Sequence, residues 1–395
     1  MLRLEVVASG LALALSVGCS NGSSSGPPDR LTTFQAADLV IGQPDFVSGS
    51  ANQGSSSASA AGVEYPVGDA QGVSGGLALP DTYNHRLLVY RSIPSANGTA
   101  ADSVLGQSDA TSNAPSHSTG RFHYPQSVGV SGSALIVADS GASRIVLGAG
   151  ADNVTIGWGD GSTCQWGCAV NMLSEPSRAI VVAGKLIVAD RSNHRILIWK
   201  QIPASGVSAD LVLGQQDLTH CAANDMVGAG NSGGRTATTL RYPTDVWSDG
   251  TRLLVVDQGN NRVLLWNHFP TSNAAAADVV LGQPDFLVAR AEATQVGLNW
   301  PVAVASDGQS IFVADARNHR VLVWRSFPSA NGQAADLVLG QGDFSHGAPN
   351  DDNQDGQTEG PTARTMNTPM GVALVGDYLV VTDTYNHRFL LFRRH

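Results

Sequence analysis

The chain has little charge and almost no lysine. Only 14% of its 395 residues are Asp, Glu, Lys or Arg, against about 25% in an ordinary globular protein. Lys185 and Lys200 are the only lysines, and the formal net charge is −10. Binding along a nucleic-acid backbone needs a concentrated basic surface, so we expect no nucleic-acid partner. Disorder is excluded for most of the chain, because 42% of its residues are hydrophobic.

Long hydrophobic runs and helical patterns are also missing. Residues 6–17 (VVASGLALALSV) are apolar but too few to span a bilayer as a helix, and no other segment is apolar enough to do so. The chain is instead rich in the two poorest helix formers, with 44 Gly and 18 Pro. Its apolar residues stand in short runs between turn residues, a pattern that predicts an all-β protein of many short strands.

The N-terminal apolar stretch is typical of the core of an export signal. Cys19 follows it directly, and residues 15–19 (LSVGC) resemble a bacterial lipoprotein signal, in which the cysteine is lipidated and becomes the mature N-terminus. We therefore predict a signal peptide at 1–18 and a Gly/Ser/Pro-rich tether at 19–33. Membrane contact is expected only through this lipid anchor, which places the protein in the cell envelope; ordinary secretion is the alternative.

Three short sequence patterns recur six times each. The first is an Asp-x-x-Asn-His-Arg pattern between apolar runs, typical of a strand, an Asx-type turn and a strand; it starts at Asp81, Asp139, Asp190, Asp257, Asp315 and Asp383. The second is an Ala-Asp-Leu-Val-Leu-Gly-Gln pattern, which starts at Ala37, Ala101, Ala151 (degenerate), Ala209, Ala277 and Ala335. The third is a proline that opens a strand, at Pro66, Pro125, Pro176, Pro243, Pro301 and Pro369.

Each repeat therefore contains four antiparallel strands, and six such units arranged radially make a six-bladed β-propeller. The order of the patterns also predicts how the ring closes. A Gly-Gln strand at 37–43 precedes the first hairpin, and the chain ends just after the sixth hairpin. We expect residues 37–43 to complete the last blade, because this removes an open sheet edge.

The Asn-His-Arg tripeptides at Asn84, Asn193, Asn318 and Asn386 resemble NHL repeats, and the VLGQPDF-type lines resemble those of bacterial exported NHL proteins. The resemblance covers residues 34–395 and implies the propeller fold. Because the sequence shows no catalytic motif and its repeated residues have an architectural role, we expect a non-catalytic binding or scaffold module. NHL-like relatives also include a metal-dependent amidating lyase and, more remotely, lactonases and a streptogramin lyase. The alternative is therefore a lyase-like or lactonase-like enzyme with its site at the channel mouth.

The repeated polar residues are interpreted as architectural. A carboxylate before a turn accepts backbone N–H groups, Asn tolerates a left-handed turn position, and the Arg fork suits a carboxylate and turn carbonyls. The same interpretation applies to the four repeated histidines, which are His85, His194, His319 and His387. The repeat itself explains why these histidines recur, so their presence does not require a metal site.

Non-repeated sequence gathers between the Gly-Gln strands and the following Pro-led strands, in residues 47–64, 111–123, 219–241, 287–299 and 345–367. In a four-stranded blade these connections lie on the same side of the disc as the Asp-x-x-Asn-His-Arg turns, and we call this side the loop face. Function on repeat scaffolds sits on such loops. We expect a monomer that binds a protein or a saccharide through its loop face.

Several residues near the expected channel are candidates for binding. Arg178 and Asp245 stand two positions after a proline in neighbouring blades and form either a structural ion pair or the polar end of a ligand site. Four aromatic residues directly precede a proline and either stack on a flat ligand such as a sugar or pack onto the first strand; they are Tyr65, Tyr124, Tyr242 and Trp300. If the protein is an enzyme, the best catalytic candidates are Glu64, His123 and Arg241, one position earlier.

Residues 351–356 (DDNQDG) begin like an EF-hand loop, with oxygen ligands at alternate positions and then a glycine. The possible calcium ligands are Asp351, Asn353, Asp355 and Glu359. The alternative is a solvated acidic loop, and we expect no other cofactor from the sequence.

Three cysteines fall in consecutive loops of the loop face, at Cys164, Cys168 and Cys221. Export permits a disulfide, and three thiols allow one internal bridge whose partners the sequence leaves open. A Cys/His zinc site with His220 is a further possibility.

Overall fold

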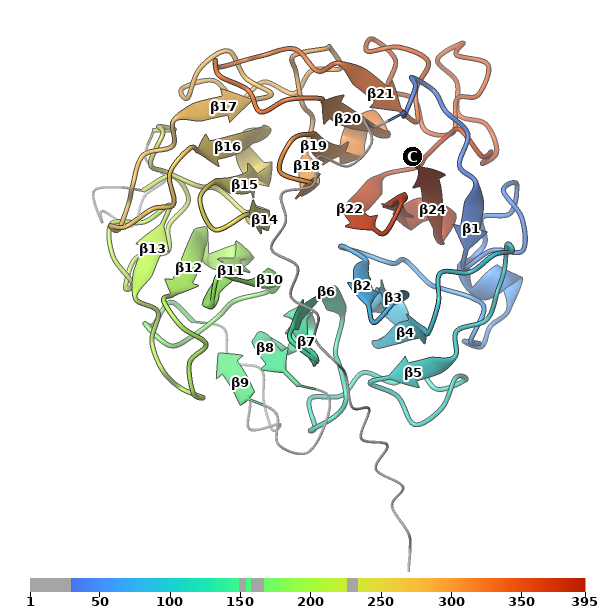
Figure 1. Cartoon of the computed structure of the whole chain (residues 1–395), viewed down its shortest axis with the longest axis horizontal. Coiled ribbons are helices and arrows are strands. Elements are labelled where there is room, and N and C mark those ends of the chain that lie inside the picture. Colours follow the sequence, from blue (N-terminus) through green and yellow to red (C-terminus); the bar gives the residue numbers. More distant parts are fainter. Residues whose placement is uncertain (1–29, 149–153, 158–166, 226–233, 395) are drawn as a thin grey trace, which may run out of the picture.

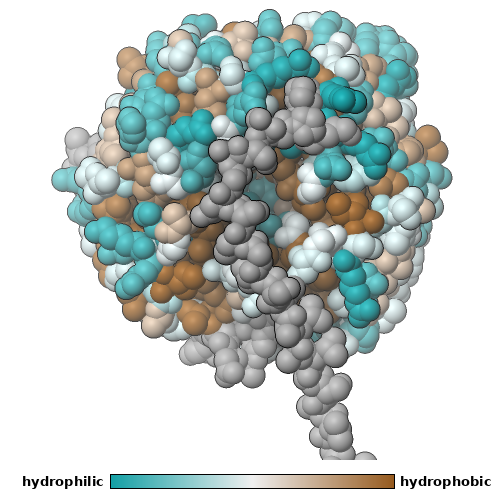
Figure 2. Space-filling model, in the orientation of Figure 1, coloured by the Kyte–Doolittle hydropathy of each residue, from teal (hydrophilic) through white to brown (hydrophobic). Residues whose placement is uncertain are grey.

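The computed structural model describes residues 30–148, 154–157, 167–225 and 234–394. Six four-stranded antiparallel sheets stand around a central axis and form a six-bladed β-propeller, which confirms the predicted fold class (Figure 1). In five blades the four strands follow one another in chain order from the channel outward, and in the sixth the N-terminal strand takes the outermost place. Figure 2 shows that the described surface seen down this axis mixes hydrophilic and hydrophobic residues all around the disc. No helix among the described residues has the length and apolar character needed to cross a bilayer.

The strand bounds of the first three blades are β2 (Gln71–Val73), β3 (Gly76–Asp81), β4 (Arg86–Tyr90) and β5 (Ser103–Leu105); β6 (Pro125–Ser131), β7 (Ala134–Asp139), β8 (Arg144–Leu147) and β9 (Val154–Gly157); β10 (Pro176–Val182), β11 (Lys185–Asp190), β12 (Arg195–Trp199) and β13 (Leu211–Leu213). Those of the last three are β14 (Pro243–Ser248), β15 (Leu253–Asp257), β16 (Arg262–Trp266) and β17 (Val279–Leu281); β18 (Pro301–Ser306), β19 (Ile311–Asp315), β20 (Arg320–Trp324) and β21 (Leu337–Leu339); β22 (Pro369–Val375), β23 (Tyr378–Asp383), β24 (Arg388–Arg393) and the N-terminal β1 (Leu39–Ile41).

One-turn 3-10 helices occupy the six hairpin turns, and a seventh lies in the first long loop. Their bounds are η1 (Ala51–Gly54), η2 (Thr82–Asn84), η3 (Ser140–Ala142), η4 (Arg191–Asn193), η5 (Gln258–Asn260), η6 (Ala316–Asn318) and η7 (Thr384–Asn386). The residue after each turn helix has a left-handed backbone, as at His194 with φ +55°. This is the conformation that Asn tolerates best among non-Gly residues.

The ring closes as the sequence predicts. Strand β1 pairs antiparallel with β24, with Leu39 opposite Leu391 and Ile41 opposite Phe389, so one sheet contains both ends of the folded body. Leu31, which was expected in the tether, is 1% exposed and packs in a hydrophobic cluster with residues of blades 5 and 6. The described chain is therefore packed against the body from Leu31 onward.

The apolar side chains fill the spaces between blades. One cluster joins Leu254 and Val256 of blade 4 to Val313 and Trp324 of blade 5, all 0% exposed. Strands such as β20 are buried at every residue. Because successive side chains of a strand point to opposite faces of the sheet, this pattern shows that both faces are covered. This burial explains the low charge, because an unpaired charge between two blades would be strongly destabilising.

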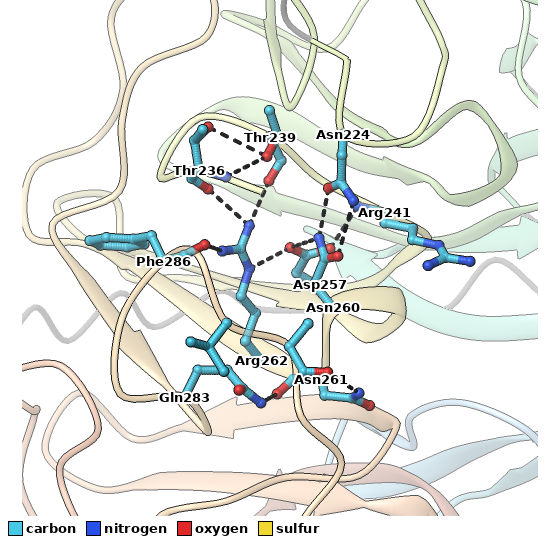
Figure 3. Close-up of polar contacts among 12 residues, drawn as sticks. Asn224, Thr236, Thr239, Arg241, Asp257, Asn260, Asn261, Arg262, Gln283 and Phe286 are labelled. Atoms are coloured by element: carbon cyan, nitrogen blue, oxygen red, sulfur yellow. Dashed lines mark hydrogen bonds and ion pairs between the residues drawn. The ribbon is translucent and has the colours of Figure 1, made fainter. Parts of the chain in front are cut away.

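The repeated Asp and Arg hold the hairpin turns to the long loops. In blade 4, Arg262 Nε lies 2.7 Å from Asp257 Oδ2, and both side chains are 0% exposed (Figure 3). The remaining guanidinium nitrogens donate to loop carbonyls on both sides, at 2.6 Å to Phe286 and 2.9 Å to Thr239. All six blades contain this ion pair, at 2.7 or 2.8 Å between Nε and Oδ2.

The repeated Gln also anchors a loop. Gln283 Nε2 donates to the carbonyl of Asn261, the left-handed residue of the hairpin, and to the carbonyl of Arg290 in the long loop. Asn224 of another long loop exchanges side-chain amide hydrogen bonds with Asn260. The long loops vary in sequence, but repeated contacts hold their ends.

Five of the six prolines open an innermost strand as predicted, whereas the prediction for Pro66 is wrong, because β2 begins only at Gln71. Asp81 follows Pro66 by fifteen positions, while the spacing is fourteen in every other blade. The extra residue is accommodated at Gly68, whose φ is +82° and whose Cβ position would lie 1.5 Å from the Gln126 carbonyl oxygen. Only glycine fits there. Pro80 of the neighbouring strand also lacks the N–H that would pair with this segment.

Candidate functional site

A cavity of about 550 Å³ occupies the channel where it opens on the loop face. Its wall comes from all six blades, because each contributes part of a hairpin turn or of the segment that follows the repeated proline position. The residues that line it include Asp69, Tyr83, Tyr124, Ser127, Gly141, Glu175, Arg178, Arg191, Asp245, Trp300, Arg317 and Tyr385. A cavity of this size, with aromatic side chains and a few convergent polar groups, has the form of a small-ligand site.

Arg178 of blade 3 forms ion pairs with two carboxylates, one from blade 1 and one from blade 4. Its Nε lies 3.2 Å from Asp245 Oδ1 and its Nη1 lies 3.4 Å from Asp69 Oδ2. Asp69 and Asp245 are 2% and 3% exposed. We call these three residues the inner triad. The predicted proximity of Arg178 and Asp245 is confirmed as an ion pair, and the triad gives the cavity a polar inner wall.

The two carboxylates also accept hydrogen bonds from backbone N–H groups of innermost strands in neighbouring blades. Asp69 Oδ1 accepts the backbone N–H of Val372 in blade 6, and Asp245 Oδ2 accepts that of Val304 in blade 5. Each acid therefore links its own blade to an adjacent one, Asp69 to blade 6 and Asp245 to blade 5. Since an unpaired buried N–H is costly, the triad has an architectural role besides lining the cavity.

Burial raises the pKa of Asp245 well above its ordinary value, and the nearby carboxylate of Asp69 raises it further, against the opposing effect of Arg178. Burial also raises the pKa of Asp69, which Arg178 opposes. Two carboxylates that share one site cannot both ionise easily. Burial and the neighbouring Asp69 carboxylate therefore favour the protonated form of Asp245, whereas Arg178 opposes it.

Sequence reasoning missed Asp69, because it placed Gly68 at the second position after Pro66. Strand β2 pairs Gln71 with Ala78, and continuing that register places Asp69 opposite Pro80. Arg178 and Asp245 occupy the corresponding place opposite Ala189 and Val256. The additional residue between Pro66 and Asp81 is the signal that could have revealed the shift.

Ser127 occupies this same position in blade 2. It is 1% exposed and lines the cavity, and its Oγ has no hydrogen-bond partner among the described residues. A buried hydroxyl without a partner is uncommon. Ser127 therefore offers a hydrogen bond to a molecule in the cavity.

One half of the mouth is an arc of four tyrosines, contributed by blades 6, 1 and 2. The ring centroids of Tyr385 and Tyr65 are 5.5 Å apart, those of Tyr65 and Tyr83 are 5.2 Å apart, and those of Tyr83 and Tyr124 are 5.0 Å apart. Tyr83 and Tyr385 are 47% and 50% exposed. They come from the hairpin turns and were missed by the sequence analysis, which treated all turn residues as architectural.

The other half of the mouth contains arginines stacked on aromatic rings. The Arg317 guanidinium carbon lies 3.3 Å from the Trp300 ring centroid, and that of Arg191 lies 5.4 Å from the Tyr242 centroid. Arg191 is also paired with Glu175 at 3.0 Å. The mouth is therefore divided into a tyrosine half and a cationic half.

The four predicted aromatic residues do not all reach the cavity. Tyr124 and Trp300 line it, whereas Tyr65 and Tyr242 are not part of its wall. Each has a left-handed backbone, with φ from +37° at Tyr65 to +55° at Trp300. The N–H of each is accepted by the hairpin residue of the preceding blade, for example by His194 Nδ1 at 3.0 Å from Tyr242. The same Nδ1 contact occurs at His85, His319 and His387, and Asn261 Oδ1 replaces it beneath Trp300.

Burial lowers the pKa of His85, His194, His319 and His387 to about 4. A neutral ring has the acceptor nitrogen that these inter-blade bonds need. The histidines therefore join neighbouring blades, in agreement with their architectural interpretation.

The three catalytic candidates do not form one site. Glu64, His123 and Arg241 belong to the approaches to blades 1, 2 and 4, and none lines the cavity. Glu64 accepts a hydrogen bond from Asn52 Nδ2 at 2.9 Å, and His123 contacts His117, with 2.8 Å between ring nitrogens.

The acidic loop is held by its own hydrogen bonds. Asp351 is 0% exposed and accepts the backbone N–H groups of Asp355 and Gly356 at 3.0 and 2.9 Å. Asn353 Nδ2 donates to Glu359 at 2.7 Å. Within the described part of the chain, no three His, Cys, Asp or Glu side chains are grouped as metal ligands. Calcium binding here stays a prediction.

The structure pairs Cys168 with Cys221, with 5.9 Å between their Cα atoms. The disulfide connects the long loops that precede blades 3 and 4. His220 contacts Asp217 at 2.7 Å instead of a thiolate. Cys164 lies outside the described residues, as do Cys19 and the predicted signal peptide.

Comparison with known proteins adds only distant likenesses. No family model matches the chain, and no curated protein matches it. Among solved structures, a chain of the mitotic checkpoint complex is 9% identical with a TM-score of 0.46 and covers 98% of this chain and 99% of its own length. Streptogramin B lyase is 9% identical with a TM-score of 0.44, covering 83% of this chain and 94% of its own. The WD40 β-propeller domain of Doa1 is 9% identical with a TM-score of 0.41, covering 83% of this chain and 79% of its own. Likenesses this distant carry no inference about function.

Proposed function

We propose that this protein is an exported, NHL-type binding module that holds a saccharide in the cavity at the mouth of its channel. The N-terminal sequence supports export, and the Cys19 pattern supports a lipid anchor that tethers the body to the envelope. The Asn-His-Arg hairpins support the NHL assignment, because their histidines join neighbouring blades in a repeated manner.

The tyrosine arc is the observation that carries this proposal. Tyr83 and Tyr385 expose about half of their surface beside the cavity, although a propeller needs no aromatic side chain at the tip of a hairpin turn. Amphipathic rings of this kind supply apolar faces for stacking and hydroxyl groups for hydrogen bonds at low entropic cost. The apolar faces and hydroxyls of sugar rings complement both.

The wall behind the arc is also suited to a polar, uncharged surface. In the inner triad Arg178 forms ion pairs with both carboxylates, and Ser127 adds a buried hydroxyl that has no partner among the described residues. These groups accept and donate hydrogen bonds without imposing a large net charge. Sugar hydroxyls, which both donate and accept, fit such a wall.

A glycan array screened with the purified body, followed by isothermal titration with the glycans that bind, tests the proposal. We expect binding that weakens about tenfold or more in Tyr83→Ala and in Tyr385→Ala. Ile202→Ala is the matched control, since Ile202 is 42% exposed and lies at the opposite end of its blade, just after β12. Absence of glycan binding by the folded wild type would refute the proposed function.

A further inference from the structure

One position of the hairpin turn differs sharply between the two halves of the ring. It is the second residue after the repeated Asp, occupied in blade order by Tyr83, Gly141, Ser192, Gly259, Arg317 and Tyr385. The three long side chains belong to blades 5, 6 and 1, which are neighbours around the ring. Blades 2, 3 and 4 have glycine or serine there. One continuous sector of the mouth therefore presents an arginine followed by two tyrosines.

Packing explains the two glycines at this position but not the long side chains. A Cβ at Gly141 would lie 2.9 Å from His123 Cγ, and a Cβ at Gly259 would lie 2.6 Å from Arg241 Cγ. In these blades the residue before the aromatic position fills the space, so the turn must have a glycine. In blades 6 and 1 the turn residue projects into solvent instead, with 50% of Tyr385 and 47% of Tyr83 exposed.

Arg317 differs from the other arginines of the cavity in its charge balance. Arg178 is paired with Asp69 and Asp245, and Arg191 is paired with Glu175. Arg317 is exposed and forms no ion pair with any described residue. Its guanidinium stacks 3.3 Å from the centroid of Trp300, which orders the side chain while its N–H edge stays available to an anion.

From this arrangement we infer that the saccharide is acidic and that Arg317 binds its carboxylate. The inference rests on the proposed function. A planar guanidinium matches a carboxylate with two parallel hydrogen bonds. Tyr385 occupies the same turn position in the adjacent blade, so a sugar ring that stacks there can place a ring carboxylate next to Arg317. A uronic acid has this combination of a sugar ring and a carboxylate.

The negative net charge of the whole chain makes the Arg317 side chain significant for ligand choice. The chain carries a net charge of −10, so a non-specific polyanion is repelled at long range. Capture of an acidic glycan then depends on a local contact that outweighs the general repulsion. Arg317 is the cavity-lining arginine, among those described, that is without a carboxylate partner.

The test compares a carboxylate glycan with its uncharged counterpart on the same protein. The probes are a galacturonic acid trimer, the same trimer as its methyl ester, and an array of uronate, sialate and neutral oligosaccharides. We expect the wild type to prefer carboxylate glycans over their esters by about tenfold to a hundredfold, the range of a charge-assisted hydrogen-bonded pair. We expect Arg317→Gln to abolish that preference while it still binds the neutral ester.

Arg252→Gln is the matched control. Arg252 also stacks on an aromatic ring, with its guanidinium carbon 3.6 Å from the Phe327 centroid, but it lies in the turn between β14 and β15, at the other end of the blade. Its substitution should leave the preference unchanged. Thermal melting of each variant shows whether it is folded.

Each outcome of the screen bears on the inference. Equal binding of the acid and its ester, or binding of neutral glycans alone, would overturn the acidic-ligand inference and leave the proposed function intact. Binding of no glycan would overturn both. Binding only of peptides with a free C-terminal carboxylate, included as a separate arm, would show that Arg317 serves a protein partner and would also overturn the inference.

Discussion

The repeated histidines predict a specific loss of stability in acid. Each folded-state pKa lies at about 4, below the ordinary value of about 6.5, because burial disfavours the charged ring. The unfolded chain therefore binds more protons than the folded chain between these values. The stabilising contribution is complete above pH 6.5 and is lost as the pH falls toward 4.

The variant that isolates this effect is suggested by blade 4. Asn261 occupies the histidine position there, and its Oδ1 accepts the N–H of Trp300 at 2.8 Å. Replacing His85, His194 and His387 with Asn therefore keeps an acceptor for each inter-blade bond and removes the titrating group. These histidines are 5%, 9% and 6% exposed, so solvent screens the effect little.

The magnitude follows from the linkage between proton binding and folding. For each histidine, lowering the pH from 7 to 5 costs the folded state about 2 kcal/mol relative to a group that does not titrate. Three such residues give about 6 kcal/mol. At about 2 cal/mol/K of unfolding entropy per residue, this is roughly 8 °C of melting temperature for a body of this size.

The assay is calorimetric melting of the wild type and the triple Asn variant at pH 7 and pH 5. We expect the melting temperature of the wild type to fall by several degrees more than that of the variant. His268→Asn, at an exposed position, serves as the control and should follow the wild type. An equal fall in the wild type and the triple variant would refute the reasoning, because the carboxylates that also titrate are common to both.

Three further predictions concern the same framework. Deleting residues 34–46 removes β1 and leaves the outer edge of β24 without a partner strand, so calorimetry should show a large and cooperative loss of stability; a truncated protein that melts like the full chain would contradict the closure of the ring. Asp190→Ala leaves Arg195 buried without its carboxylate and should cost about 3 to 5 kcal/mol without weakening glycan binding specifically, and unchanged denaturant unfolding would count against the architectural role. Asp245→Asn should destabilise the body less than Asp69→Asn at pH 7, because the pKa of Asp245 is raised well above its ordinary value and the residue is nearer to neutral; the opposite order in chemical denaturation would show that Asp69 carries the shared proton.

Most of the fold could be predicted because the same sequence patterns recur at a regular spacing along the chain. Six copies of the hairpin pattern gave the number of blades, and the position of residues 37–43 before the first hairpin gave the closure that pairs Leu39 with Leu391. The failure at Pro66 has a local cause. One additional residue and a left-handed Gly68 move the start of β2, and a pattern anchored on the proline does not detect that shift.

The candidate site was less predictable, because its chemistry depends on which blades face one another. Arg178 and Asp245 were identified by their shared position after a proline, but the second carboxylate, Asp69, was hidden by the shifted register. The exposed Tyr83 and Tyr385 lie within the Asp-x-x-Asn-His-Arg pattern, whose repeated residues have an architectural role. Their exposure could be known only once the blades were placed around the channel.

By itself, the sequence determined the architecture of this protein. Periodic apolar runs, turn residues and buried Asp–Arg pairs act within a blade or between neighbouring blades, so local spacing is enough to specify them. Only the tertiary structure decided where ligand chemistry can occur. The inner triad draws Asp69, Arg178 and Asp245 from three blades, and closing the ring brings Arg317 and the two exposed tyrosines into one sector of the mouth. The contact of Asp69 with Arg178 and the grouping of Arg317 with the exposed tyrosines depend on that closure, and no local pattern encodes them.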